Sequence, residues 1–225
     1  MSALNGVKVL DLSRVLAGPW CGQTLADLGA DVIKVESFDG DDTRGMGPPY
    51  IGEISAYFSC ANRNKRSICI DLHKAESREV IHALVKQADV LIENFRTGTA
   101  ERLGVGYETL SAINPRLIYC SVSGYGRTGP EAARAGYDYA VQAEGGLMAI
   151  TGARDGAPNK VAVAVVDLAT ATREAKAKLF GLRAQPEVRA GKAAIVEKHA
   201  SRKKTTTTRT QAKLNRSNKQ HAFEF

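Results

Sequence analysis

An aspartate that follows an apolar run is the strongest chemical candidate in the sequence. In the stretch VAVAVVDLATA, Asp167 comes directly after the apolar residues 161–166 and before small residues. The run of valine and alanine predicts a buried strand over residues 161–168 that ends at this carboxylate. Burial would strip water from the charge and leave an ionised, poorly hydrated nucleophile. The alternative is that Asp167 only caps a following helix, as aspartate commonly does.

A second group lies in AGYDYAVQAEGG, residues 135–146, where Tyr137 and Asp138 follow a glycine. The two residues stand where a helix could begin, and the glycines at its end would let a ligand approach the backbone closely. The alternative is an ordinary helix start with Asp138 at the positive end of the dipole.

A third group lies in ENFRTGTAERLG, residues 93–104, after another strand-like run. Asn94 offers both donors and acceptors, and Arg96 and Arg102 offer guanidinium groups that match phosphate. The alternative is that both arginines are solvated surface residues.

Alternating strand-like and helix-like segments must position these groups. Strands are predicted at residues 7–13, 31–37, 66–72, 89–95, 116–124 and 161–168, and helices at 21–30, 74–88, 107–113 and 137–150, after a break at Gly18 and Pro19. This alternation predicts an α/β fold with a Rossmann-like, doubly wound, mostly parallel sheet covered by helices on both faces. Ligands of such sheets bind beyond the carboxyl ends of the strands. Neither GxGxxG nor GxxxxGK[ST] occurs, so a dinucleotide or P-loop site is not supported.

Charge divides the chain into two parts. Residues 1–170 carry 17 Lys and Arg against 20 Asp and Glu, whereas residues 171–225 carry 14 against 4. We expect a domain over residues 1–171 and a basic, low-complexity tail over 172–225, disordered or weakly helical, because it has too few large apolar residues to offset its ordering entropy. Its charge permits nucleic-acid binding, but aromatic residues are not interleaved with the basic ones.

Composition also bears on metals and location. The four cysteines form no CxxC pair, and His73 and His82 are the only histidines of residues 1–171, which argues against a metal site. Dispersed cysteines fit a reducing compartment, and neither a membrane span nor a targeting peptide is recognisable. We therefore expect a cytoplasmic protein, or one of the mitochondrial matrix in a eukaryote.

Several longer stretches resemble one family in the same order. They include LNGVKVLDLSRVLAGPWCGQTLADLGADVIKVES, NRNKRSICIDL, ADVLIENFRTGTAERLGVGYETLSAINPRLIYCSVSGYGRTGP, AGYDYAVQAEGGLMAITG and VAVVDLATA. Residues 4–171 are similar to the N-terminal part of class III CoA-transferases of the CaiB/BaiF type. That group includes formyl-CoA transferase, succinyl-CoA-dependent transferases and α-methylacyl-CoA racemase.

The resemblance implies a role for Asp167 as the nucleophile that passes CoA from an acyl-CoA donor to a carboxylic acid through an aspartyl-CoA thioester. Tyr137 matches a tyrosine that lines the transferase site. In the racemases a histidine stands there as a general base, a role for which tyrosine is poorly suited at neutral pH. Tyr137 therefore favours a transferase, and a 2-methylacyl-CoA racemase is the alternative.

The resemblance also implies a CoA site and no tightly bound cofactor, since acyl-CoA is a substrate. The implied CoA-binding residues are Arg14, Leu16, Ala17, Ile70, His73, Asn94, Phe95, Arg96 and Arg102. Arg102 is best suited to the nucleotide phosphates. Leu16 replaces a glutamine of formyl-CoA transferase, which favours the succinyl-CoA-dependent dicarboxylate transferases.

Members of the family are considerably longer and form interlaced homodimers. The landmarks that normally follow the catalytic motif are not found after Asp167, so we expect a truncated form, as a frameshift would produce, that does not form the interlock. A non-catalytic truncated product with a nucleic-acid-binding basic tail is the remaining alternative.

Overall fold

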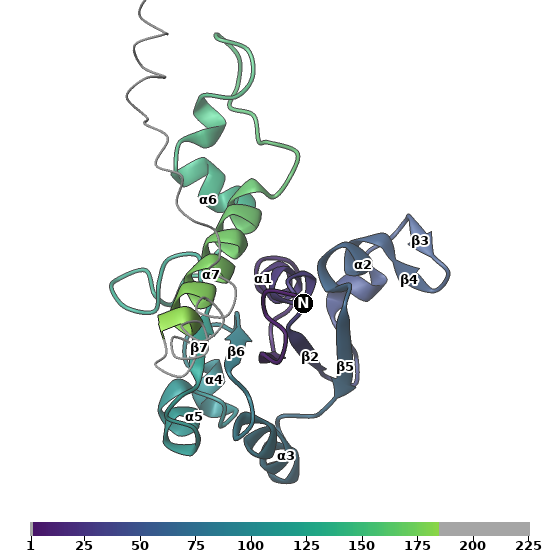
Figure 1. The fold of residues 1–225 in the computed structure, drawn as a ribbon. Helices are drawn as coiled ribbons and strands as arrows, with labels where there is room; N and C mark the ends of the chain where they lie inside the picture. Colours follow the sequence, from purple (N-terminus) through teal and green to yellow (C-terminus); the bar gives the residue numbers. More distant parts are fainter. Residues whose placement is uncertain (1, 185–225) are drawn as a thin grey trace, which may run out of the picture. The chain divides into compact units, whose positions relative to one another are not determined.

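Among residues 2–184, which are those that the computed structural model describes, five strands form one parallel sheet (Figure 1). In spatial order they are β5 (Lys65–Cys69), β2 (Asp31–Glu36), β1 (Lys8–Asp11), β6 (Val90–Glu93) and β7 (Ile118–Ser121). All four neighbouring pairs are parallel. The strand order reverses between β1 and β6, and such a switch point is where α/β sheets usually bind ligands.

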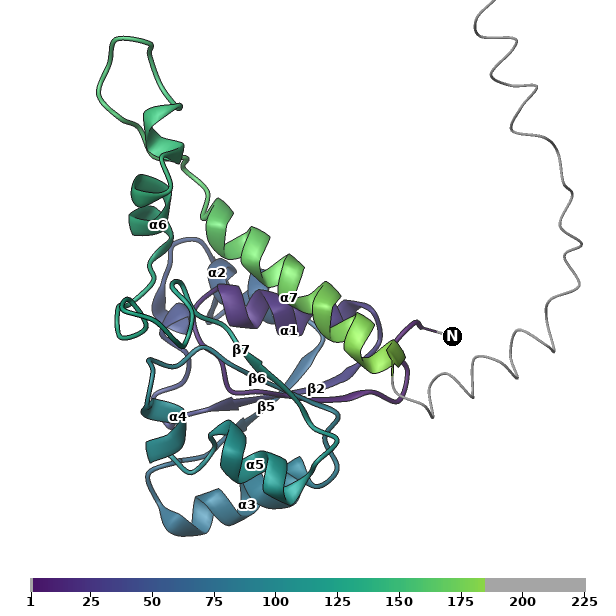
Figure 2. The ribbon, with the colours of Figure 1, turned by 90° about the vertical axis from the view of Figure 1, so that its left-hand side faces the viewer.

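Helices cover both faces of this sheet, as Figure 2 shows. On one face lie α1 (Ala17–Asp27) and α7 (Val165–Ala184), and on the other lie α3 (Ala75–Val85), α4 (Thr99–Arg102) and α5 (Tyr107–Ile113). Neighbouring residues of β1 point to opposite faces, so that Val9 packs in the first core with Leu25 of α1, and Leu10 packs in the second with Ile81 of α3. The predicted doubly wound α/β fold is confirmed.

Five of the six predicted strands are confirmed, but the strand predicted at residues 161–168 is wrong. Residues 161–164 have no regular structure, and α7 begins at Val165. The backbone N–H groups of Val166 and Asp167 donate to the Asp138 carboxylate at 2.8 and 3.0 Å. The first N–H groups of a helix have no partner within the helix, and these bonds satisfy two of them. The end of the valine-rich run can therefore form the first turn of α7.

The break predicted at Gly18 and Pro19 is also wrong, because α1 begins at Ala17 and contains both residues. Proline fits the first turn of a helix, where its missing N–H is not needed.

Short elements occupy segments that were predicted as loop or left unassigned. They are the 3₁₀ helix η1 (Asp42–Gly45), the hairpin strands β3 (Tyr50–Ile51) and β4 (Ile54–Ser55), and α2 (Ala56–Asn62). The predicted helix at residues 137–150 divides into α6 (Asp138–Glu144) and the 3₁₀ helix η2 (Leu147–Ala149). The Ser55 hydroxyl caps α2 by accepting from the Phe58 N–H at 3.0 Å.

Most of the predicted tail, residues 185–225, lies outside the described residues, and the boundary between residues 171 and 172 stays a prediction. Within the part of the chain that the structure describes, no helix has the length and apolar character needed to cross a membrane.

Candidate functional site

The loops that follow β1 and β6 are joined at the switch point of the sheet. The backbone N–H of Arg14 donates to Asn94 Oδ1 at 2.9 Å, and Asn94 Nδ2 donates to the Arg14 carbonyl at 2.7 Å. Two candidate residues that are far apart in the sequence are thereby brought together. Both the oxygen and the nitrogen of the Asn94 side-chain amide are used in fixing the loop, so its role in the structure is to position Arg14.

The neighbouring candidates include apolar residues and two exposed cations. Leu16 is buried, and Phe95 packs partly buried against the core on the α3 face. Ala17 is partly buried and begins α1, while Arg14 and Arg96 are exposed. Guanidinium groups match phosphates, and apolar side chains suit the flat or aliphatic part of a ligand.

Three further candidates lie at the β5 side of the sheet and beside α4. The buried Ile70 donates its backbone N–H to the Glu36 carbonyl at 2.8 Å, and His73 is exposed. Arg102 ends α4, is exposed, and donates to Thr99 Oγ1 at 3.3 Å.

Arg78 of α3, which sequence reasoning did not single out, connects these two regions. Its Nη2 atom donates to the His73 carbonyl at 3.3 Å. Its side chain also lies against Gly104, where a Cβ would stand 3.0 Å from Arg78 Cδ. The loop of His73 and the turn after Arg102 therefore meet through α3.

Arg127 was also missed as a single residue, although its loop SGYGRTGP follows a predicted strand. Its Nη2 atom donates to both oxygens of the buried Glu93 at 3.0 Å, and its Nη1 donates to the Phe95 carbonyl at 2.6 Å. Glu93 Oε2 in turn accepts the Phe95 N–H at 2.7 Å. The arginine thus fixes the backbone next to Asn94 from the neighbouring loop.

Replacing Arg127 with methionine is expected to lower the free energy of unfolding by about 2–3 kcal/mol, because the change leaves the Glu93 charge buried without its partner. Urea unfolding measures the loss. Arg66→Met is the matched control, since Arg66 and Asp31 form an exposed pair at 2.7 Å and exposed pairs contribute little. Equal losses in the two variants would contradict the assigned role of Arg127.

Asp167 lies in the first turn of α7 and not at a strand end. The amide groups at this helix start are held by Asp138 of α6, which is 8% exposed. Gln142, one turn further along α6, donates to the second oxygen of Asp138 and accepts the Val161 N–H at 3.0 Å. The carboxylate that caps α7 therefore comes from another helix, and Asp167 itself is left available.

The surroundings of Asp167 disfavour its charge. Burial and the nearby Asp138 carboxylate raise the pKa of Asp167 to about 6. Burial and the charge of Asp167 in turn raise the pKa of Tyr57, a partly buried residue of α2. Asp167 is thus mostly ionised at neutral pH, and Tyr57 keeps its proton. No sequence pattern pointed to Tyr57, because α2 was not predicted.

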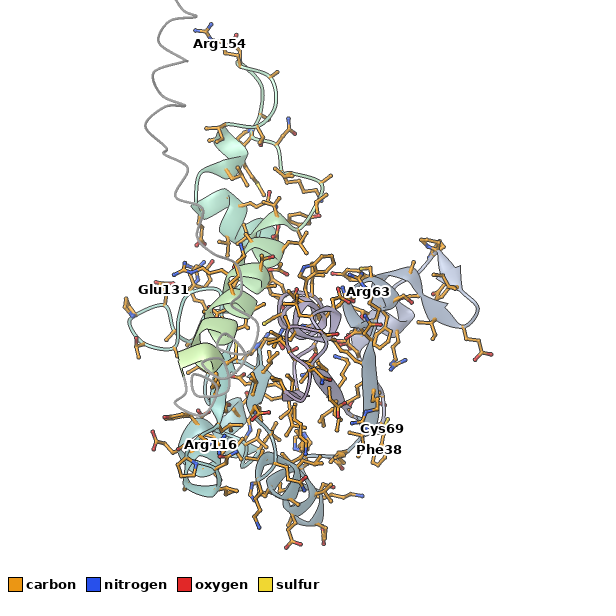
Figure 3. The ribbon with its side chains drawn as sticks, in the orientation of Figure 1. Phe38, Arg63, Cys69, Arg116, Glu131 and Arg154 are labelled. Carbon is orange, nitrogen blue, oxygen red and sulfur yellow. The ribbon has the colours of Figure 1, made fainter. Side chains whose placement is uncertain are left out.

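Tyr137 immediately precedes α6, and its side chain is 67% exposed. The residue that contacts the backbone of Asp167 is its neighbour Asp138, which the sequence indicated only as a possible helix start. Glu131, labelled in Figure 3 on the loop between β7 and α6, accepts from Arg134 at 2.8 Å. Arg134 also pairs with Glu144 of α6, so this loop is tied to the helix that carries Asp138.

Metal-ligand side chains do not gather anywhere in residues 2–184, where no group of three or more His, Cys, Asp or Glu is arranged to hold a metal ion.

Comparison with known proteins relates this geometry to a family. The model of CoA-transferase family III matches residues 4–221. Succinate–glutarate CoA-transferase of Agrobacterium fabrum is 53% identical over 174 residues, which cover 74% of this chain and 44% of that protein. Human succinyl-CoA:glutarate CoA-transferase is 48% identical over 180 residues, covering 80% and 41%.

A solved structure agrees with these relatives. The CAIB/BAIF family protein from Brucella suis superposes with a TM-score of 0.79 at 52% identity, over 84% of this chain and 51% of that one. This chain spans about half or less of the length of the proteins it matches. The match to most of the chain, together with the shared fold, shows that the protein belongs to CoA-transferase family III.

Proposed function

We propose that this chain carries the nucleophile of a CoA-transferase that moves CoA from succinyl-CoA to a dicarboxylic acid. The observation that supports this most directly is the setting of Asp167, a carboxylate with a pKa of about 6 beside a second carboxylate. A partly desolvated carboxylate that is still ionised at neutral pH is a usable nucleophile. The choice of donor and of acid class is supported by the Agrobacterium and human relatives, which are named as transferases for succinate or succinyl-CoA and glutarate.

In the first half of the proposed reaction, Asp167 attacks the thioester carbonyl of the donor. The C–S bond breaks, and a mixed anhydride and CoA thiolate form. The thiolate then attacks the aspartyl carbonyl, which releases succinate and leaves an aspartyl-CoA thioester. Each step exchanges one acyl bond for another, so the energy of the thioester is kept as long as water is excluded.

In the second half, the acceptor carboxylate attacks the aspartyl thioester to give a new anhydride and CoA thiolate. The thiolate attacks the acceptor carbonyl, which frees Asp167 and releases the new acyl-CoA. The first amide groups of α7 are already bonded to Asp138, so they do not receive the oxyanion of these steps. Tyr57 remains protonated near Asp167 and is a donor of the required type.

For the CoA moiety we propose the loops that follow β1 and β6, together with His73 and Arg102. Asn94 and Arg127 hold the backbone of these loops, and Leu16 and Phe95 give them an apolar base. Arg14, Arg96 and Arg102 are exposed and carry the positive charge that phosphates require. Because α1 and α7 cover the same face of the sheet, the loop before α1 and the start of α7 both belong to that face.

The test is acceptor-dependent formation of a new acyl-CoA. The chain is incubated with succinyl-CoA and glutarate, and glutaryl-CoA is measured by chromatography. We expect glutaryl-CoA to form only when both substrates are present. Solvent deuterium entering C2 of a 2-methylacyl-CoA, with no glutaryl-CoA formed, would replace the transferase by a racemase.

A further inference from the structure

Two lysines lie deep beneath the loop that follows β1. The side chains of Lys34 on β2 and Lys65 on β5 are only 1% and 2% exposed. Lys34 Nζ pairs with Asp41 Oδ2 at 2.8 Å, and Lys65 Nζ pairs with Asp11 Oδ2 at 2.8 Å. Buried ion pairs of this kind often add no net stability over apolar residues of the same volume, so their presence needs a further reason.

Both ammonium groups also bind backbone carbonyls, one at each end of residues 13–19. Lys34 Nζ donates to the Ser13 carbonyl at 2.8 Å, and Lys65 Nζ donates to the Pro19 carbonyl at 2.7 Å. Lys65 also donates to Asn62 Oδ1 at 2.9 Å. The segment is thus held from below at Ser13, in the loop after β1, and at Pro19, in the first turn of α1.

The aspartates hold the same loop. Asp11 Oδ1 accepts the Ser13 N–H at 3.0 Å, and Asp41 Oδ1 accepts the Val15 N–H at 3.4 Å. Burial alone would raise the pKa of Asp41, but the Lys34 ammonium and hydrogen bonds from Lys34 and Thr43 outweigh it and lower that pKa. Asp41 therefore keeps its charge to lower pH than an ordinary aspartate.

Between the two anchored ends, the backbone is forced into an unusual conformation. Val15 has a φ of 69°, in the left-handed region that β-branched residues avoid. A Cβ on Gly18 would overlap the Ser13 side chain, so the two ends of the turn are in close contact. A strained conformation persists only where the surroundings impose it, and here the two lysine–aspartate pairs do so.

We infer that the pairs Lys34–Asp41 and Lys65–Asp11 are positioning groups that hold residues 13–19 in the single conformation that receives CoA. This rests on the proposed function, in which Arg14, Leu16 and Ala17 of the same loop contact CoA. A loop that is ordered before binding loses less conformational entropy when the ligand arrives, which is how the buried pairs raise affinity.

The test combines two variants of the full chain with a matched control. The double variant K34M/D41N removes one pair without leaving an unpaired buried charge. Val15→Gly relieves the strained position and frees the loop. Asn64→Gly is the control, because Asn64 also has a positive φ, 64°, but lies outside residues 13–19.

Hydrogen exchange of the peptide that covers residues 12–20 and calorimetric titration with CoA are measured on each protein. We expect K34M/D41N and Val15→Gly to speed exchange in this peptide and to raise the Kd for CoA by about tenfold, with Val15→Gly at least as stable as the unmodified chain. Asn64→Gly is expected to leave both quantities unchanged.

A purely structural role gives a different outcome. If K34M/D41N lowers the melting temperature but leaves loop exchange and the CoA Kd unchanged, the inference is overturned. Failure of the unmodified chain to bind CoA would reject the proposed function and the ligand named here. In that case the exchange data still decide whether the two pairs hold the loop.

Discussion

Replacing Asp167 with asparagine is expected to abolish CoA transfer. A carboxamide cannot form the anhydride or the thioester, so the rate should fall by about three orders of magnitude or more. The measurement is the initial rate of glutaryl-CoA formation from succinyl-CoA and glutarate. Asp155→Asn is the control, because Asp155 is exposed and lies outside the proposed site. A rate for D167N within about tenfold of the unmodified chain would contradict covalent catalysis.

The same substitution is expected to stabilise the fold at neutral pH. The pKa of Asp167 is raised from 3.8 to about 6, so above this pH the folded protein carries a charge that its surroundings disfavour. Asparagine removes that cost, a gain of about 1–2 kcal/mol after allowance for partial exposure. The gain shrinks as the pH falls from about 6, and below about pH 3 the carboxyl is protonated in both the folded and the unfolded state, so the gain disappears. Urea unfolding of D167N and of the control D155N, at neutral pH and at the low pH where the gain should disappear, measures this change in stability.

The second large effect is expected at Asp138. In Asp138→Ala the amide groups of Val166 and Asp167 lose their acceptor, and α7 loses the cap that fixes its first turn. We expect a loss of about 2–3 kcal/mol in the free energy of unfolding. Transfer should slow by about a hundredfold, because the nucleophile is no longer held in place.

Asp138→Asn separates the cap from the charge. Asparagine keeps one oxygen for the α7 amide groups, although its NH₂ group then faces the donor of Gln142. We expect a smaller loss of stability than in Asp138→Ala. Because the negative charge is gone, the pKa of Asp167 should fall, and the acid limb of the pH–rate profile should move to lower pH. Equal losses in both variants with an unmoved profile would contradict this role.

The layered fold could be predicted because its strands are short β-branched runs between turn residues. Residues 31–37 and 89–95, for example, read directly as buried parallel strands, and β2 and β6 lie within them. The alternation of strands and helices also predicted that Arg14 and Asn94 lie at the same edge of the sheet, beyond the carboxyl ends of their strands. Their mutual hydrogen bonds depend on the pairing of β1 with β6, which the sequence did not indicate.

The start of α7 could not be predicted for a specific physical reason. Valine and alanine in residues 161–166 give a short apolar run whose period does not separate a strand from a buried helix. The run becomes the start of a helix because its amide groups are bound by Asp138, which is 28 residues away from Val166 in the sequence. No local pattern contains that contact, so local propensity favoured a strand while the tertiary cap produced a helix.

The supporting charges were missed for a similar reason. Lys34, Lys65, Glu93 and Arg127 read as ordinary charged residues, and only the folded chain places each beside its partner. The candidate CoA residues came from loops that the family resemblance marked. The residues that hold those loops became apparent only from the buried ion pairs beneath them.

Mass spectrometry after incubation with succinyl-CoA shows whether Asp167 forms a covalent bond to the substrate. We expect a CoA thioester confined to the peptide that carries Asp167, converted by hydroxylamine to a hydroxamate and absent from D167N. An unmodified Asp167 in a chain that nonetheless transfers CoA, or an adduct on another residue that persists in D167N, would contradict the account.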